Sequence, residues 1–209
     1  LQTTWRGLVE AMRYSAIGIG PEDIKNPSID TIQFLEETKE TRTGSPAQPK
    51  FVAANIQLYD YFEPFQIIEA GGKKIGVTML VGDAELAEIA EVAEADYVRI
   101  PVAEALANVV PKLRQAQCDV YILGATMSLD ACREIVQQYP LFDFVLAGCG
   151  VGEPTREPEP IQVGDHLTSL IQIGSKSMHS IVIGLYFDSG KLTSRYQRVP
   201  MDARFEVDS

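Results

Sequence analysis

The sequence predicts a mixed α/β fold, in which strands and helices alternate before a final run of antiparallel strands. Two apolar segments, "CDVYILGAT" (118–126) and "FDFVLAGCG" (142–150), lie on either side of an amphipathic helix at 128–138, a pattern typical of a β-α-β unit. Both strands are apolar along their whole length. We therefore expect a sheet that is covered on both faces.

The N-terminal part is expected to supply the first strands and helices. A short helix at 8–12 leads into a strand at 14–19, and Pro27 opens a second helix. After a polar connector, a strand is expected at 51–56 ("FVAANI"). Residues 65–81 then predict a β-hairpin that turns at a Gly-Gly pair.

Two further helices and three late strands complete the predicted fold. The helices are expected at 83–96 and 103–116, with Pro111 either kinking the second one or lying in its first turn. A Pro-rich loop is expected at 153–160. The late antiparallel strands are "HLTSLIQIG" (166–174), "SIVIGLYFD" (180–188) and "LTSRYQRVP" (192–200).

The composition is that of one globular domain over residues 1–209. Hydrophobic residues make up 45% of the chain, enough for a substantial core. The formal net charge is −11, and this excess of acids would repel nucleic acid and anionic lipid. No apolar run approaches the roughly 20 residues that span a bilayer. We therefore expect neither nucleic-acid binding nor membrane insertion.

The cysteines predict neither a metal site nor a disulfide framework. Cys118, Cys132 and Cys149 are an odd number at wide and unrelated spacings, and no haem-attachment motif occurs. Cys118 lies beside a predicted strand, where a free cysteine usually acts as a small buried apolar residue.

Three loops follow predicted strands, at 20–23, 124–126 and 148–151. Ligands of α/β sheets gather beyond the carboxyl ends of parallel strands, so these loops are where a site is expected. Gly18 and Gly20 flank the first strand end. Because no phosphate-binding glycine motif accompanies them, a tight backbone turn is favoured over a phosphate cradle.

The order of these segments resembles the calcineurin-like metallophosphoesterases, specifically the catalytic domain of the 5′-nucleotidase group. The resemblance implies a layered α-β-β-α sandwich with mixed sheets. It also implies an N-terminal strand with an Asp-x-His motif, which should precede Leu1, so we expect an incomplete or processed version of the domain. The segments that carry it are "MRYSAIGIGPEDI", "FVAANI", "GKKIGVTMLV", "CDVYILGAT", "FDFVLAGCGVGEP" and "LIQIGSKSMHSIVIGLYFD".

The resemblance also implies a dinuclear metal site that activates water and holds a phosphate. In this chain Pro21 and Glu22 stand at the family's Asn-His pair, and Asp23 stands at the Glu that follows. A later His of the family falls on Ala125. Asn55 is retained, on what the family uses as a supporting strand. The positions of the degenerate site are Pro21, Glu22, Asp23, Asn55, Ala125, Cys149 and Val151.

Most of these side chains cannot bind a metal ion. Ala125 and Val151 have no lone pair, Pro21 cannot replace an amide oxygen, and Cys149 has no His or Cys neighbour in sequence. The two acids on the first loop make at best a weak site for a hard cation. We therefore expect no catalytic residue, no bound metal and no cofactor.

The chain has two histidines. His166 follows Asp165, a pair that could be a base with its orienting acid, although a surface turn residue is the simpler interpretation. His179 lies where the family has a turn near its substrate cleft, so we treat it as a possible ligand contact.

The stretch "YQRVPMDARF" (196–205) carries a second resemblance. It is similar to the junction in bacterial proteins where a degenerate 5′-nucleotidase-like domain precedes a multihaem cytochrome c segment. This implies an electron-transfer partner and an extracytoplasmic, periplasmic location.

Two hypotheses of function follow. The first is a catalytically inactive 5′-nucleotidase-like module that serves as a binding or assembly surface for another protein chain, either a multihaem cytochrome c or the missing N-terminal part. The second is a metal-dependent phosphohydrolase completed by that segment or by another chain, with Glu22, Asp23, Cys149 and His179 as replacement ligands. A binder of small ligands at the same cleft is not separable from the first.

Overall fold

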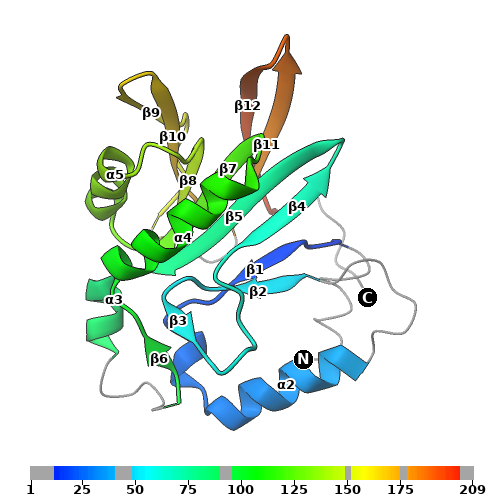
Figure 1. Ribbon diagram of the computed structural model, residues 1–209, viewed down its shortest axis with the longest axis vertical. Helices are drawn as coiled ribbons and strands as arrows, with labels where there is room; N and C mark the ends of the chain where they lie inside the picture. Colours follow the sequence, from blue (N-terminus) through cyan, green and yellow to red (C-terminus); the bar gives the residue numbers. More distant parts are fainter. Residues whose placement is uncertain (1–11, 41–48, 90–95, 149–151, 175–177, 203–209) are drawn as a thin grey trace. The chain divides into compact units, whose positions relative to one another are not determined.

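The computed structural model describes residues 12–40, 49–89, 96–148, 152–174 and 178–202 (Figure 1). The chain divides into two compact units, Leu1–Thr126 and Met127–Ser209. The expectation of one domain over residues 1–209 stays a prediction. The predicted helix at 8–12 and the polar connector before residue 49 fall almost wholly outside the described residues.

A three-stranded arrangement organises the first unit. Strands β4 (Gln66–Ala70) and β5 (Lys73–Val81) form an antiparallel hairpin, and β7 (Val120–Thr126) pairs with β5 in parallel. Gly71 and Gly72 have φ angles of 59° and 74°, which suit the two central positions of a tight hairpin turn. The predicted hairpin is therefore confirmed, and Figure 1 shows it as a long ribbon.

Two short strand pairs complete the β-structure of this unit. Strands β1 (Ala16–Gly18) and β2 (Lys50–Val52) pair in parallel. Strands β3 (Ile56–Gln57) and β6 (Val98–Arg99) pair antiparallel.

The single strand predicted at 51–56 is wrong, because the chain changes partners after Val52. The N–H of Ala53 donates to the Glu63 carbonyl at 2.9 Å, whereas that of Ala54 donates to the Met79 carbonyl at 2.8 Å. These bonds connect the backbone first to Glu63 and then to Met79 of β5, and regular strand pairing resumes only at Ile56.

The helices in the described residues of the first unit are α2 (Ser28–Glu40), α3 (Asp83–Glu88) and α4 (Val102–Ala116), with a 3₁₀ turn, η2, at Asp23–Lys25. Helix α3 ends well before the predicted residue 96. Pro111 lies in the interior of α4, not in its first turn, and is exposed. The buried face of α4 consists of Ala105, Leu106, Val109, Val110 and Leu113.

Close contacts run from α4 through β5 and β1 to α2. At Gly76 of β5 a Cβ atom would lie 3.1 Å from Leu113 of α4. At Gly18 of β1 a Cβ atom would clash with the sulfur of Met79, on the opposite face of β5. Phe34 of α2 packs edge-on against Phe51 of β2, which pairs with β1. The mixed α/β class and the mixed pairing are thus confirmed.

In the second unit the described residues form one helix and two groups of strands. Helix α5 (Leu129–Gln138) begins at Ser128, whose hydroxyl accepts the Ala131 N–H at 3.2 Å. Strand β10 (His166–Gln172) pairs in parallel with β8 (Phe144–Ala147) and antiparallel with β9 (Glu159–Val163). Strands β11 (His179–Asp188) and β12 (Lys191–Pro200) form a long hairpin.

Strand β9 corrects the prediction of a Pro-rich loop at 153–160. Pro160 lies inside this strand, opposite Ser169 of β10. Proline has no N–H to donate, and strands tolerate it at an edge, where one side of the backbone has no ladder to complete. In the pairings of the second unit β9 has β10 as its one partner.

The two cysteines that the structure describes differ in burial. Cys132 of α5 is fully buried, whereas Cys118 is only partly buried, contrary to expectation. Burial nevertheless raises the pKa of the Cys118 thiol.

Among the helices described, none is long and apolar enough to cross a membrane.

Candidate functional site

The turn after β1 is closed by Asp23 in two ways. The Asp23 N–H donates to the Gly20 carbonyl at 3.2 Å, and the Asp23 carboxylate accepts the Gly20 N–H at 2.7 Å. Pro21 occupies the second position of this four-residue turn, where its fixed φ is favourable. The Asp23 carboxylate therefore holds the backbone of the turn.

The neighbouring acid, Glu22, is engaged with a side chain of the same loop. Its carboxylate forms an ion pair with the Lys25 ammonium at 2.7 Å, and its side chain is 83% exposed. The Asn26 amide donates to the carbonyls of Glu22 and Asp23, both at 3.3 Å. Each of the two acids thus makes a local contact within the loop.

Ala125 occupies a buried and apolar position near the carboxyl end of β7. Its exposed fraction is 4%. It is paired in register with Leu80 of β5, and the next carbonyl, of Thr126, accepts the Gly82 N–H at 2.9 Å. The backbone at the end of β7 is therefore hydrogen-bonded to the end of β5 and to Gly82.

Asn55 binds the backbone of Val81 through both ends of its amide. The amide nitrogen donates to the Val81 carbonyl at 2.6 Å, and the amide oxygen accepts the Val81 N–H at 3.0 Å. Asn55 is fully buried. It acts as a structural clamp between the loop after β2 and the end of β5.

The structure brings part of the predicted site together at one end of the first unit. Gly18 contacts Met79, and Met79 is paired with Gly124, so the strands β1, β5 and β7 end at the same edge. The turn at 20–23, the clamp of Asn55 and the apolar Ala125 therefore share this edge. Cys149 and Val151 lie outside the described residues.

His179 belongs to the second unit, where it opens β11 opposite Pro200. Its Nδ1 atom is buried and has no hydrogen-bond partner within the described part of the chain. Nearby, a hydrogen bond from Arg198 at 2.9 Å lowers the pKa of Glu153, and the charge of His179 adds a smaller lowering. His179 stays a possible ligand contact.

His166 has a structural contact rather than an acid partner. Its Nε2 atom lies 3.1 Å from the Phe142 carbonyl, and the hydroxyl of Thr168 donates to the same oxygen at 2.7 Å. His166 is half-buried at the start of β10 and so is not the surface turn residue of the simpler interpretation, and its contact with the Phe142 carbonyl favours a structural role over a base oriented by Asp165.

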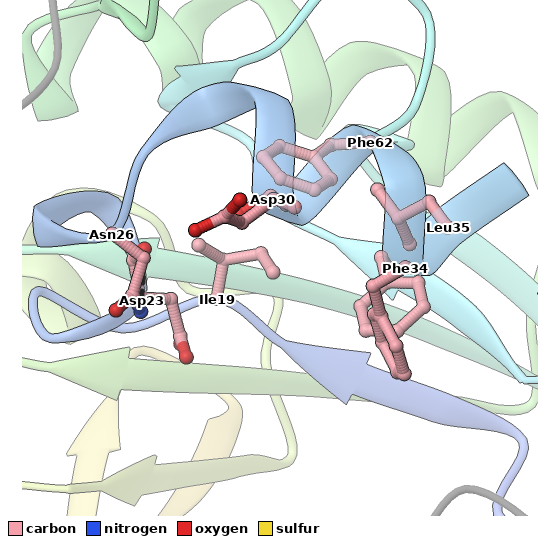
Figure 2. A pocket seen from close by; sticks show the side chains of 9 residues that line it. Ile19, Asp23, Asn26, Asp30, Phe34, Leu35 and Phe62 are labelled. Atoms are coloured by element: carbon pink, nitrogen blue, oxygen red, sulfur yellow. Dashed lines mark hydrogen bonds between the residues drawn. The ribbon is translucent and has the colours of Figure 1, made fainter. Parts of the chain in front are cut away.

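The structure contains a pocket that the sequence interpretation missed. It has a volume of about 340 Å³ and lies between the end of β1, helix α2 and β2. Its apolar wall combines members of the buried core with half-buried rings on α2 and β2, and Figure 2 shows several of these side chains at one end of the pocket. The apolar lining residues are Ile19, Phe34, Leu35, Phe51 and Phe62.

The other end of the pocket is polar. Asp23, Asn26, Asp30 and Thr31 line it, and Figure 2 shows Asp23 and Asn26 together, with Asp30 between them and the ring of Phe62. The signal that could have found the pocket is helical spacing. Asp30 and Thr31 are each followed four residues later by an apolar residue, so polar and apolar side chains share one face of α2.

A second, shallower pocket of about 400 Å³ lies between α3 and the start of α4. Asp83, Arg99 and Pro101 are among its lining residues. The Asp83 carboxylate accepts the Val102 N–H at 3.0 Å and so joins the two helices.

Metal-binding side chains do not converge in the structure. Over the five described ranges, no group of three or more His, Cys, Asp or Glu side chains is arranged to hold a metal ion.

Comparison with known proteins places the chain by fold and not by sequence. No model of a known protein family matches it, and no curated protein matches it either. Solved structures do. The 5′-nucleotidase precursor of Thermus thermophilus superimposes with a TM-score of 0.72 at 15% identity, over 95% of this chain and 42% of that one.

Two other solved structures give the same result. The NAD nucleotidase NadN of Haemophilus influenzae has a TM-score of 0.70 at 14% identity, covering 93% of this chain and 36% of that one. The calcineurin-like phosphoesterase YfkN of Bacillus subtilis has a TM-score of 0.65 at 16% identity, covering 96% of this chain and 68% of that one. The chain thus has the fold of 5′-nucleotidases and calcineurin-like phosphoesterases, and spans less than half the length of the two nucleotidases.

Proposed function

We propose that this chain is a degenerate phosphoesterase-fold module that binds another protein and does not hydrolyse phosphate esters. The observation that carries the proposal is which residues stand at the strand ends of the first unit and what they already contact. Ala125 offers no donor atom, and the Asp23 carboxylate closes a turn by accepting the Gly20 N–H at 2.7 Å. A dinuclear centre needs several nitrogen and oxygen ligands converging on each ion.

The remaining positions point the same way. Both ends of the Asn55 amide are bonded to the backbone of Val81, and the Glu22 carboxylate is paired with Lys25. Recruiting Asn55 as a metal ligand would break contacts that the fold already uses, and one oxygen of each acid, Oδ2 of Asp23 and Oε1 of Glu22, is already bonded. A buried N–H and a buried carbonyl would lose their partners if Asn55 turned away.

The partner that we propose is a multihaem cytochrome c segment outside the cytoplasmic membrane. This part of the proposal rests on the resemblance of residues 196–205. The net charge of −11 supports it only in general terms, because an acidic surface favours association with basic partners. An acidic chain would lose this attraction as the salt concentration rises.

A metal-dependent phosphohydrolase is the second candidate, and the fold similarity to 5′-nucleotidases favours it. In this alternative Glu22, Asp23, Cys149 and His179 serve as replacement ligands, completed by a further segment or chain. In this alternative the acids of the first loop would bind the metal through carboxylates that already accept the Gly20 N–H and pair with the Lys25 ammonium.

The two candidates are separated by metal analysis combined with an activity assay. The purified protein would be analysed for bound metals and assayed on p-nitrophenyl phosphate and AMP with added Mn²⁺ or Zn²⁺. We expect less than stoichiometric metal and no turnover above a protein-free blank. Stoichiometric metal together with turnover that Asp23→Ala abolishes would overturn the proposal. Turnover that Asp23→Ala leaves unchanged would identify a contaminating phosphatase.

A further inference from the structure

We propose that the pocket between β1, α2 and β2 binds a small organic cation, namely an ammonium group carried on an aromatic or branched apolar body. The pocket has two chemically distinct ends. Phe34 and Leu35 lie at one end and Asp23 and Asn26 at the other, with Asp30 next to the ring of Phe62 (Figure 2). A ligand that matches both ends must be apolar along most of its length and positively charged at its tip.

The apolar end is suited to an aromatic body. Phe34 and Phe51 meet edge to face, with ring centroids 6.3 Å apart and an interplanar angle of 79°, so they present ring surfaces in two directions. The ring of Phe62 is held in place by stacking on the ring of Tyr97, with the ring centroids 6.4 Å apart. A ring placed here would gain apolar contact with a wall that is already ordered.

The polar end is suited to a cation. Asp23 and Asp30 carry two negative charges, and none of the described residues that line the pocket is basic. The nearest basic residue along the loop, Lys25, is paired with Glu22. The start of helix α2 adds a positive partial charge of about half a unit, which the two carboxylates outweigh. An ammonium group also interacts favourably with the faces of aromatic rings.

The same charges argue against an anionic ligand. A phosphate or carboxylate at this end would meet Asp23 and Asp30, and the described part of the lining offers no compensating cation. The volume of about 340 Å³ lies at the lower limit of ligand pockets, so a small molecule fits better than a peptide. This inference is independent of the proposed function, because it concerns a pocket and a ligand class that phosphate hydrolysis does not use.

The test uses three probes of similar shape and different charge. Phenethylamine is the cation, 2-phenylethanol is the neutral analogue and 3-phenylpropanoate is the anion. Binding to the 209-residue chain would be followed by ¹H–¹⁵N NMR. We expect shifts at residues that line the pocket and binding of phenethylamine about threefold to fivefold tighter than that of 2-phenylethanol. We expect 3-phenylpropanoate to bind more weakly than either.

Two variants and a matched control locate the effect. Asp30→Asn removes an exposed carboxylate from the rim and is expected to weaken phenethylamine binding by about twofold to threefold while leaving 2-phenylethanol unchanged. Phe34→Leu is expected to weaken both probes. Glu104→Gln is the control, since Glu104 is also an acid in the first turn of a helix but does not line the pocket.

Three results would overturn the inference. These are equal binding of the three probes, NMR shifts that spare the pocket, and a Glu104→Gln effect as large as that of Asp30→Asn. The outcome of the phosphatase assay does not enter, so failure of the proposed function and failure of this inference are distinguishable.

Discussion

The side-chain amide of Asn55 is bonded to both backbone groups of Val81, its nitrogen to the carbonyl at 2.6 Å and its oxygen to the N–H at 3.0 Å. The two residues are 26 positions apart in the chain. An amide side chain here takes the place of a neighbouring strand at the end of β5. It thereby fixes the loop that joins β2 to β3.

Replacing Asn55 with Ala is expected to destabilise the protein by about 2–5 kcal/mol, because a buried donor and a buried acceptor each lose their partner. Urea unfolding followed by circular dichroism would measure the change. Asn108→Ala is the control, since Asn108 is exposed on helix α4 and Ala is the better helix former. A loss at Asn55 no larger than that at Asn108 would contradict the clamp.

The fold was predictable where local sequence decides it. The hairpin at 65–81 follows from two glycines between two apolar-rich segments, and both glycines adopt the positive φ angles that its turn requires. The strand at 51–56 was not predictable as two pieces, because the bonds of Ala53 and Ala54 go to residues far along the chain. Strand β9 was missed because Pro160 normally argues against a strand, and only its edge position permits it.

The contact between Gly18 and Met79 predicts that substitutions at these two positions have coupled effects on stability. A Cβ atom at Gly18 would clash with the Met79 sulfur, so Gly18→Ala is expected to cost about 1–3 kcal/mol of stability through overpacking. In the background of Met79→Ala the clash is removed, and the same change should cost much less. A double-mutant cycle of thermal or urea unfolding would measure the coupling. Strictly additive effects would show that Met79 does not limit this position.

The candidate site was less predictable than the fold. The sequence indicates that Ala125 cannot bind a metal, since that follows from residue type alone. It does not reveal that the Asp23 carboxylate accepts the Gly20 N–H, because a carboxylate on a loop could equally face a ligand. The pocket beside it was missed for a similar reason. Phe51 joins Phe34 only through folding of β2 against α2.

The ion pair between Glu159 and Arg133 predicts a pH-dependent contribution to stability. The guanidinium binds both carboxylate oxygens, at 2.9 and 2.8 Å, and holds the pKa of Glu159 below its ordinary value. A carboxyl group whose pKa is lowered by folding stabilises the protein above its unfolded pKa and loses this effect as the pH falls through its folded pKa.

Glu159→Gln is therefore expected to lower stability slightly at about pH 7 and to make no difference at about pH 3. The effect is small because both side chains are partly exposed, at 39% for Arg133 and 41% for Glu159. Urea unfolding at several pH values would measure it. Glu157→Gln, at an exposed position of the same unit, is the control. A difference that grows toward acid pH would contradict the assigned direction of the pKa shift.

The turn after β1 predicts that Asp23 matters for stability through its oxygen acceptor and not through its charge. Asp23→Ala leaves the Gly20 N–H without its 2.7 Å partner and is expected to cost about 1 kcal/mol. Asp23→Asn keeps an amide oxygen in the same place and should retain most of the wild-type stability. Thermal unfolding of both variants would measure this. Equal losses in the two variants would mean that the charge itself is needed, as expected of a metal ligand, and would argue against a structural role for this carboxylate.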